Sequence, residues 1–227
     1  MAQPLIYDFV AELAGRVALP EPIVEFGSMQ VEAGQPNDLR RLFAGRDFTG
    51  TDMRPGPGVD RVEDLRALTY PDASVGTALC LDTLEHCADP LGAVREIHRV
   101  LAPGGVCVLS SVMFFPVHGY PQDYWRFTPE GMRLVLEPFP QRWSRGVGHP
   151  ELPMQVVGVG LKQRPLAELD LDGMHTLADA QAEWDRAEGK VRVGLLHVPL
   201  RELARTLAGE LPRAVAQRAA ARLRSRP

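Results

Sequence analysis

A glycine and two acidic residues follow predicted strands at a spacing that suits a ribose-containing ligand. Gly27 ends the apolar run Ile23–Phe26, and a glycine there lets the backbone turn tightly and approach a ligand. Asp52, 25 residues further along, ends the next run, and its carboxylate can accept hydrogen bonds from both hydroxyls of a ribose. Asp82 ends the buried run Val75–Leu81. Since ligands of open α/β sheets bind at the carboxyl ends of the strands, these residues predict a binding site at one sheet edge.

Alternating apolar segments predict the elements that would hold these residues. Strands are predicted over residues 23–26, 48–51, 75–81, 106–112, 142–147 and 154–162, and helices over 4–18, 90–101 and 129–136, with a further helix entering at 36–38. The Pro-Gly-Gly of 103–105 is expected to stop the helix that precedes it. Because helices and strands alternate along the chain, the pattern predicts an α/β domain with a mostly parallel sheet.

The pattern changes after residue 162, which predicts a domain over 1–162, with its core at 20–162, and a mainly helical extension over 163–227. Helices are expected there at 174–188 and 199–225. Residues 1–162 hold 14 Lys and Arg against 20 Asp and Glu, whereas the extension holds 11 against 9. The leucines near the basic end predict a packing face, for a homodimer or against the sheet domain. Docking of this end on an anionic partner or membrane surface is the weaker alternative.

Composition excludes several classes of protein. Of the 227 residues, 45% are hydrophobic and the net charge is −4, which excludes a disordered or collagen-like chain and gives no reason to expect nucleic acid as a partner. The three cysteines cannot all pair and are not spaced as a metal clip, so a reducing compartment and no metal are expected. The N-terminus lacks the pattern of a signal peptide, and no apolar run is long enough to span a membrane. The chain is therefore expected to be soluble and cytoplasmic.

Three motifs stand in the order and spacing of a known family. VEFGS follows the first strand pattern, GTD ends the second, and the longest motif is DLRALTYPDASVGTALCLDTLEHCADPLGAVREIHRVLAPGGVCVLS. Together they resemble the class I S-adenosylmethionine-dependent methyltransferases of the type 11 group, over roughly residues 20–162. The resemblance implies a Rossmann-like, doubly wound sheet of seven strands. It also implies methyl transfer from S-adenosylmethionine to oxygen or nitrogen of a small-molecule acceptor.

The resemblance further implies a set of contacts to the cofactor S-adenosylmethionine. The residues that match the family's cofactor motifs, from the methionine part through ribose and adenine to the reactive methyl, are Glu25, Gly27, Ser28, Asp52, Met53, Asp64, Leu65, Leu81 and Asp82. His86 belongs to the family's Leu-Glu-His element near the mouth of the site, whereas its neighbour Glu85 is assigned no role. One position departs from the pattern: Met29 stands where the family has a second glycine. Gly34 comes later, so the loop is expected to be longer and differently shaped.

Met29 leaves a second interpretation open. A bulky side chain near the carboxylate pocket is also compatible with a non-catalytic or regulatory protein of methyltransferase fold that binds S-adenosylmethionine or S-adenosylhomocysteine. A nicotinamide-dependent enzyme is disfavoured, because the motif Gly-x-Gly-x-x-Gly is absent after the first strand.

An aromatic segment over residues 114–128 follows the strand that ends at Val112 and is expected to cover the same sheet edge as the cofactor. Its rings can close the site and exclude water, and Phe115, Tyr124 and Trp125 are the predicted contacts to the acceptor. The pattern HxYPxDYWRFT in this segment resembles segments of methyltransferases that modify glycans or secondary metabolites.

The same segment contains candidate proton acceptors. His118 and Asp123, together with His86, are predicted catalytic residues that orient or deprotonate an acceptor hydroxyl. In the alternative interpretation, Asp123 pairs with Arg126 and only holds the loop in place.

Overall fold

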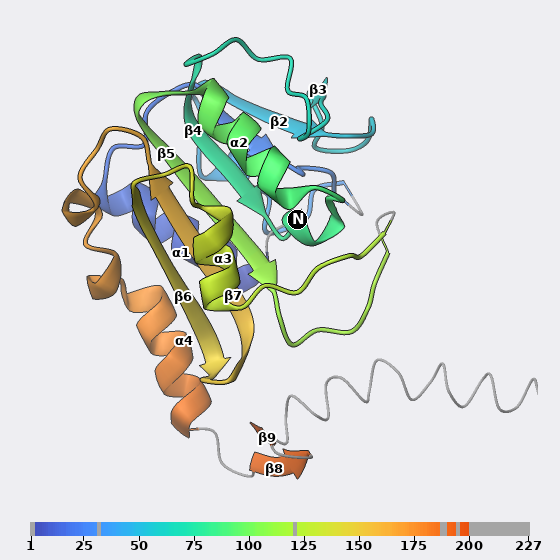
Figure 1. Ribbon diagram of the computed structural model, residues 1–227, viewed down its shortest axis with the longest axis vertical. Coiled ribbons are helices and arrows are strands. Elements are labelled where there is room, and N and C mark those ends of the chain that lie inside the picture. Colours follow the sequence, from blue (N-terminus) through green and yellow to red (C-terminus); the bar gives the residue numbers. More distant parts are fainter. Residues whose placement is uncertain (1–2, 31–32, 120–121, 187–189, 194–195, 200–227) are drawn as a thin grey trace, which may run out of the picture. The chain divides into compact units, whose positions relative to one another are not determined.

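The computed structural model describes residues 3–30, 33–119, 122–186, 190–193 and 196–199, and a seven-stranded sheet forms its centre (Figure 1). The strands of this sheet are β1 (Ile23–Phe26), β2 (Phe48–Asp52), β3 (Arg61–Val62), β4 (Val75–Leu81), β5 (Leu101–Val112), β6 (Gln141–His149) and β7 (Leu152–Leu161). Their order is β3-β2-β1-β4-β5-β7-β6, and the antiparallel pairs in this sheet are the two that β7 makes, with β5 and with β6. The predicted Rossmann-like, mostly parallel α/β sheet of seven strands is confirmed.

The strand order creates a crevice above β1 and β4. β1 pairs with β2 on one side and with β4 on the other, so the strand order reverses at β1. In the register, Glu25 of β1 lies between Gly50 and Leu79. Connections on the two sides of such a reversal run to opposite faces of the sheet and leave an opening above the strand ends. The carboxyl ends of β1, β2 and β4 therefore meet at the predicted edge.

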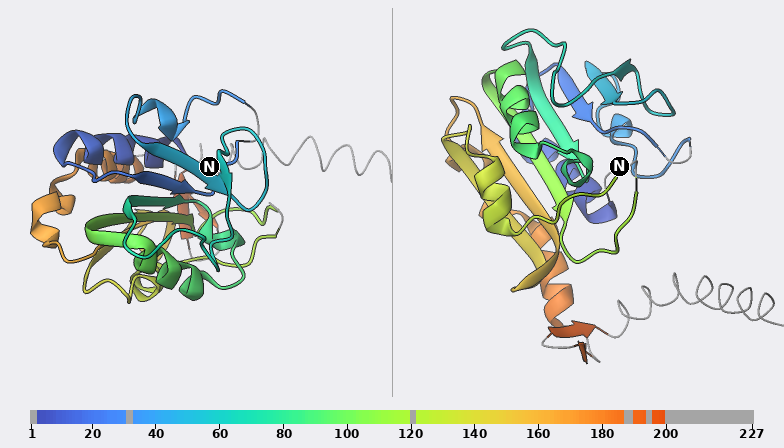
Figure 2. Two further views of the ribbon diagram at one scale, coloured as in Figure 1. Left: turned by 90° about the horizontal axis from the view of Figure 1, so that it is seen from above. Right: turned by 45° about the vertical axis from the view of Figure 1, so that its right-hand side comes forward.

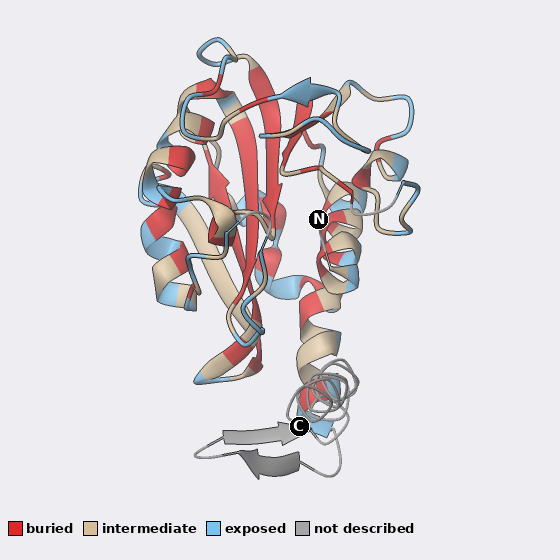
Figure 3. Ribbon diagram, turned by 90° about the vertical axis from the view of Figure 1, so that its right-hand side faces the viewer, coloured by how far each residue is buried: buried red, intermediate tan, exposed pale blue. Residues whose placement is uncertain are grey.

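Helices cover both faces of the sheet (Figure 2). One face carries α1 (Pro4–Arg16), and the other carries α2 (Pro90–Val100) and α3 (Pro129–Val135). The buried residues of α1 recur every three or four positions, at Ile6, Phe9, Val10 and Leu13, as the apolar stripe of an amphipathic helix requires. β4 is buried at every residue between the two layers (Figure 3). The doubly wound arrangement follows from these two separate apolar cores.

The end of α2 differs from the prediction. Asp89 caps the helix through its side chain and Pro90 occupies the first position, as the sequence indicates. The helix ends at Val100, and β5 already begins at Leu101. The Pro-Gly-Gly of 103–105 lies inside β5, where the register with β4 shifts. It therefore forms a bulge in a strand and not the stop of a helix.

Two short elements also differ from the prediction. The helix expected to enter at 36–38 is a single 3-10 turn, η1 (Leu39–Arg41), whose first turn is capped by the Asp38 carboxylate accepting from Arg40 N at 3.0 Å. Gly45, with φ +80°, ends this segment before a longer helix can form. The strand β3 has only two residues, both exposed, so no apolar pattern in the sequence predicts it.

The unit that contains the sheet extends beyond the predicted boundary at residue 162. It runs from Met1 to Gln181 and includes the 3-10 turns η3 (Leu166–Leu169) and η4 (Leu171–Gly173). Residues of this stretch are buried in the same core cluster as α1: Leu169, Leu171, Met174 and Leu177. The helix α4 (His175–Arg186) confirms the helix predicted over 174–188.

A second unit begins at Ala182. Its described strands β8 (Lys190–Val193) and β9 (Leu196–Pro199) form an antiparallel pair, which the prediction of a mainly helical extension did not include. The helix predicted over 199–225, and the homodimer face assigned to it, lie outside the described residues. Within the described part of the chain, no helix combines the length and the apolar character needed to cross a membrane. The cytoplasmic location stays a prediction.

Candidate active site

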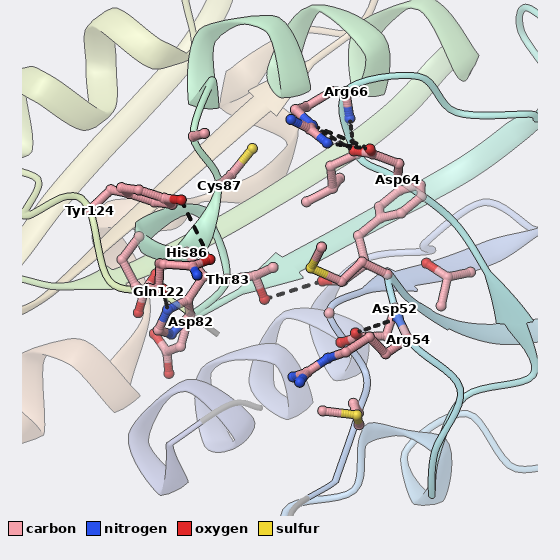
Figure 4. A pocket seen from close by; sticks show the side chains of 18 of the residues that line it. Asp52, Arg54, Asp64, Arg66, Asp82, Thr83, His86, Cys87, Gln122 and Tyr124 are labelled. Atoms are coloured by element: carbon pink, nitrogen blue, oxygen red, sulfur yellow. Dashed lines mark hydrogen bonds and ion pairs between the residues drawn. The ribbon is translucent and has the colours of Figure 1, made fainter. Parts of the chain in front are cut away.

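A cavity of about 460 Å³ opens at the carboxyl ends of β1, β2 and β4 (Figure 4). Cavities of several hundred cubic ångströms hold small-molecule and cofactor ligands. The predicted site residues that line it are Gly27, Asp52, Met53, Asp64, Leu65, Asp82, His86, Phe115, His118 and Tyr124. Those that do not line it are Glu25, Ser28, Leu81, Asp123 and Trp125. The residues predicted for the cofactor and for the acceptor thus share one cavity.

Gly27 holds the ends of three strands together beneath the cavity. Its φ is +88°, and a Cβ at this position would lie 2.1 Å from Thr83 Oγ1, which follows β4. Gly27 N and Ser28 N both donate to the carbonyl of Thr51 in β2, at 2.8 and 2.9 Å. No residue with a side chain fits this backbone without moving Thr83.

Met29 lies in the loop after β1, which hydrogen-bonds to the loop after β2. Ser28 Oγ donates to the carbonyl of Gly58 at 2.9 Å, and Gln30 N donates to the carbonyl of Pro57, also at 2.9 Å. A Cβ on Gly56 would lie 3.1 Å from Met29 Sδ. The segment after β1 therefore runs along the Pro/Gly loop that follows β2, and Met29 becomes part of the cavity wall. Between β1 and β2, the described residues form no α-helix, only η1.

The end of β2 presents a carboxylate beside an apolar side chain. Asp52 lines the cavity, and its Oδ1 accepts a hydrogen bond from Arg54 N at 3.2 Å. Met53 next to it is 52% exposed. Exposure of a large apolar side chain to water costs free energy, and a flat ligand that covered it at the cavity rim would remove this cost. The guanidinium of Arg54 also reaches the cavity (Figure 4), and its Nε is buried with no hydrogen-bond partner among the described residues.

Asp64 is already engaged by a neighbouring arginine. Arg66 Nη2 lies 2.7 Å from Asp64 Oδ2, and Arg66 N donates to Asp64 Oδ1 at 2.9 Å (Figure 4). The hydrogen bonds from Arg66 lower the pKa of Asp64. Leu65 lies between them in the chain and lines the cavity. Asp64 is therefore an ionised carboxylate whose oxygens are partly used before any ligand arrives.

Three donors from distant parts of the chain orient Asp82. Its carboxylate accepts hydrogen bonds from Gln3 N at 3.1 Å, Ser110 Oγ at 2.8 Å and Gln155 Nε2 at 2.5 Å. Asp82 itself has φ +47°, an unusual conformation for a residue with a side chain that marks a turn held by its surroundings. Gln3 lines the cavity as well. None of these three donors carries a local sequence signal.

The predicted site residues of the strand interiors lie beneath the cavity. Leu81 belongs to the core cluster that includes α1. Glu25 is 6% exposed, and its burial raises the pKa of its carboxyl to about 7. Glu25 is thus a buried acid next to the glycine turn, separated from the cavity surface.

Replacing this buried acid should remove a pH dependence of stability. Because the pKa of Glu25 is about 7 in the folded protein and near 4.5 when exposed, the folded state holds the proton more tightly. Glu25 is therefore expected to lower the free energy of unfolding as the pH rises from about 4.5 to about 7. In Glu25→Gln this contribution, up to about 3 kcal/mol, should be absent, while that of Glu85 remains. Urea unfolding of both proteins at several pH values measures it, and parallel curves would contradict the burial of a titrating Glu25.

Glu85, His86 and His118 form a cluster at the acceptor end of the cavity. Glu85 and His86 belong to the 3-10 turn η2 (Leu84–His86), and one ligand atom of each of the three side chains lies within 4.8 Å of the others. The rings of His86 and His118 meet edge to face, with centroids 4.8 Å apart. Burial lowers the pKa of His86, which favours its neutral form.

Glu85 is the most deeply buried member of this cluster. It is 1% exposed, and its Oε2 accepts a hydrogen bond from Ser111 Oγ at 3.0 Å. Its Oε1 has no hydrogen-bond partner among the residues that the structure describes. Burial, and next the negative charge of Asp82, raise the pKa of Glu85 to about 8. The sequence assigned no role to this residue.

The aromatic segment is fastened to η2. Tyr124 N and Trp125 N both donate to the carbonyl of Glu85, at 2.7 and 3.3 Å, and Trp125 Nε1 donates to the carbonyl of Cys87 at 2.8 Å. Trp125 thereby holds the segment from outside the cavity, whereas Tyr124 and Phe115 line it.

An ion pair holds the aromatic segment in its conformation. Arg126 pairs with Asp123 through both terminal nitrogens of its guanidinium, Nη1 and Nη2, and the Asp123 side chain is 1% exposed. His118 N donates to Asp123 Oδ2 at 2.9 Å. Hydrogen bonds from Arg126 hold the pKa of Asp123 well below its usual range. Asp123 is thus a fixed anion within the loop.

Loss of this buried carboxylate should unfold the loop. Asp123→Asn leaves the guanidinium of Arg126 without its counter-charge, and we expect a loss of about 3 kcal/mol in the free energy of unfolding. The control is Asp72→Asn, which removes a pair with Arg99 whose acid is 78% exposed and should cost less than about 1 kcal/mol. Denaturant unfolding of both variants compares the two pairs. Equal effects would show that burial does not distinguish them.

Comparison with known proteins finds similarity to a methyltransferase family over part of the chain. Residues 40–109 match the family model described as a methyltransferase domain. A stretch of 33 residues is 52% identical to the ubiquinone biosynthesis O-methyltransferase of Psychrobacter cryohalolentis. This stretch covers 14% of the present chain and 13% of that protein, so the match spans only a small part of the curated relative.

Solved structures share the fold over most of the chain. The 1,6-didemethyltoxoflavin-N1-methyltransferase of Burkholderia thailandensis has a TM-score of 0.51 at 19% identity, over 71% of this chain and 79% of that one. The 4+2 cyclase SpnF has a TM-score of 0.50 at 15% identity, over 71% of this chain and 80% of that one. Likeness at such identities concerns the fold alone, and the same fold carries different reactions. The activity must therefore be argued from the site.

Proposed function

We propose that the protein transfers a methyl group from S-adenosylmethionine to a small-molecule acceptor. Residues 40–109 match the model of the methyltransferase domain family. The sheet has the strand order of class I methyltransferases. One observation carries the proposal. A single cavity joins Asp52, at the end of β2, to the histidine pair beyond β4. Such a cavity can hold a nucleoside cofactor at one end and an acceptor at the other.

The residues of the cavity fit this cofactor. Asp52 would accept the ribose hydroxyls, and the exposed face of Met53 together with Leu65 would cover the adenine. Gly27 would let the methionine part approach the backbone. Arg54 would bind the carboxylate of the methionine part, because its guanidinium reaches the cavity and its buried Nε lacks a partner among the described residues.

Arg54 also explains how the site can work with Met29. In glycine-rich loops that open a helix, backbone N–H groups of the helix start bind the anionic part of a ligand. Here the described residues after β1 form no α-helix, and Met29 lies against Gly56. A side-chain cation from the loop after β2 replaces those N–H groups in our proposal.

This role of Arg54 has a sharp test in the choice of ligand. Arg54→Ala is expected to weaken the binding of S-adenosylhomocysteine about 10-fold to 100-fold, since a charged hydrogen bond is lost. The binding of 5′-methylthioadenosine, which has no amino-acid carboxylate, should change less than about 3-fold. Calorimetry with both ligands measures the difference. An equal loss for both ligands would place Arg54 elsewhere than at the carboxylate.

When bound, S-adenosylmethionine supplies a methyl group on a positively charged sulfur, so the leaving group needs no further activation. The protein must hold the acceptor in line and keep water out. Phe115 and Tyr124 form the wall on the acceptor side. A neutral histidine, His86 or His118, would accept the proton of an acceptor hydroxyl. Asp123 would only orient the loop, because its carboxylate is committed to Arg126.

A hydroxyl is the acceptor group that this site favours. Amines react without a base when they are neutral, whereas a hydroxyl gains from the two histidine rings beside it. The short match to an O-methyltransferase agrees with this choice. Glycans and secondary metabolites, which carry such hydroxyls, are the acceptor classes that we propose to screen first.

The proposal is tested by calorimetry followed by methyl labelling. The full chain is expected to bind one equivalent of S-adenosylmethionine or S-adenosylhomocysteine. Incubation with methyl-labelled cofactor and a small-molecule extract should then transfer label to an acceptor. Absence of binding of either ligand at millimolar concentration would overturn the proposal.

The loop with Met29 favours one second candidate, a non-catalytic or regulatory protein that binds S-adenosylmethionine. The two candidates differ in one result. If the cofactor binds while no acceptor fraction ever takes up label, the regulatory protein is the better account.

A further inference from the structure

We propose that Glu85, His86 and His118 bind a divalent transition-metal ion at the acceptor end of the cavity. The binding site stands on the geometry of these three side chains, and only the use of the ion rests on the proposed function. No sequence motif predicts a metal site here, because Glu85 and His86 lie more than 30 residues from His118 in the chain.

The three side chains are close enough for one ion. One carboxylate oxygen and one nitrogen of each ring lie within 4.8 Å of one another. Ligand atoms about 2.1 Å from a shared ion lie at most about 4.2 Å apart. A small shift of one imidazole ring closes this difference, and His86 and His118 already touch edge to face.

Each ring has an acceptor beside its Nδ1, which leaves Nε2 for a metal ion. His86 Nδ1 lies 2.5 Å from the carbonyl of Gln122, and a carbonyl can only accept, so Nδ1 carries the hydrogen. His118 Nδ1 lies 3.0 Å from Asp123 Oδ2 and 3.2 Å from the carbonyl of Pro116, which again are acceptors. With Nδ1 as the donor, each ring has Nε2 left as a possible metal ligand. Metal-binding histidines are oriented in this way, by a carboxylate or carbonyl on the opposite nitrogen.

Glu85 provides the independent observation that points to a ligand. Its side chain is 1% exposed, lines the cavity, and leaves Oε1 without a hydrogen-bond partner among the described residues. Such an oxygen costs free energy unless something binds it. Ser111 holds the other oxygen, so Oε1 is fixed in place.

The charges nearby also favour a cation. The negative charge of Asp82 acts on Glu85, and both side chains line this cavity. The neighbouring arginine, Arg126, is bound on both nitrogens by Asp123. A divalent ion would offset the charge of the Asp82 carboxylate and would favour the ionised form of Glu85.

The donor set selects the class of ion. Two imidazoles and one carboxylate suit Zn²⁺, Mn²⁺, Fe²⁺ or Co²⁺ better than Mg²⁺ or Ca²⁺, which prefer oxygen ligands. Three protein ligands leave coordination positions open toward the cavity. An acceptor hydroxyl bound there would have a lower pKa. Its proton would pass to solvent and its electron pair would stay on the oxygen, so the rings would act as ligands in place of proton acceptors.

The test is metal binding by the full chain after removal of metal with a chelator. Calorimetry with Zn²⁺ and electron paramagnetic resonance with Mn²⁺ should each show one bound equivalent. We expect Glu85→Gln and His118→Ala to weaken binding at least about 10-fold. Glu85→Gln keeps its shape and its bond to Ser111, and thermal unfolding checks that it folds. The matched control is His149→Ala on β6, outside the cluster, which should bind metal as the original chain does.

Binding of S-adenosylhomocysteine to the metal-free chain is measured in parallel. If no equivalent of Zn²⁺ or Mn²⁺ binds, or if the variants bind it as well as the control, the metal site is overturned. An intact affinity for S-adenosylhomocysteine in that case leaves the proposed function standing. Conversely, if the original chain binds one equivalent of metal and both variants lose this binding, the metal site is supported even if S-adenosylhomocysteine does not bind.

Discussion

Gly27→Ala is expected to weaken the binding of S-adenosylhomocysteine at least about 100-fold. The new Cβ would lie 2.1 Å from Thr83 Oγ1, and φ +88° strains any side chain. Thr83 cannot move aside freely, because its hydroxyl donates to the carbonyl of Leu81 at 2.8 Å. The ends of β1 and β4 must separate, which deforms the floor of the cavity. Calorimetry on the folded variant measures the effect.

The control for this substitution is Gly45→Ala. Gly45 has nearly the same φ, +80°, but nothing lies within 4 Å of an added Cβ. It therefore carries the backbone strain without the contact, and we expect an affinity within about 3-fold of the original. If both variants lose binding equally, strain alone explains the result and the contact with Thr83 has no special role.

Asp52→Ala is expected to weaken the same binding about 100-fold. Two charged hydrogen bonds to the ribose hydroxyls would be lost, at roughly 1.5 kcal/mol or more each. Asp52 lines the cavity, and the only hydrogen bond that its side chain makes to a described residue is with Arg54 N. The variant should therefore fold, which thermal unfolding verifies before calorimetry.

The comparison for Asp52 is Asp64→Ala. Both acids line the cavity, but Asp64 is engaged by Arg66 through several hydrogen bonds. Its oxygens offer less to a ligand, so we expect a loss below about 10-fold. A larger loss for Asp64→Ala than for Asp52→Ala would reverse the proposed orientation of the nucleoside.

The strands with long apolar patterns could be predicted from sequence, and the elements without them could not. β4 is buried at all seven residues and is matched by an uninterrupted run. β3 is exposed and depends on pairing with β2, so nothing local marks it. The Pro-Gly-Gly of 103–105 has the local chemistry of a helix stop, but Leu101 and Val106 on either side of it pair with β4, which keeps it within β5. Tertiary contacts decided both cases.

The same distinction applies to the site. Gly27 and Asp52 could be placed because strand ends share one edge of a parallel sheet. Gln3 and Gln155 could not, since they reach Asp82 from 79 and 73 residues away. Glu85 carried a faint signal, as the neighbour of His86, but its burial depends on Ser111 and on the aromatic segment that lies over it.

The structure of the chain bound to S-adenosylhomocysteine is the most direct test of the central claim, that the cavity above β1, β2 and β4 is the cofactor site. We predict that the ribose hydroxyls bind the carboxylate of Asp52, that the adenine lies against Met53 and Leu65, and that the ligand carboxylate meets Arg54. A ligand bound outside this cavity, or one whose ribose does not contact Asp52, would contradict the account.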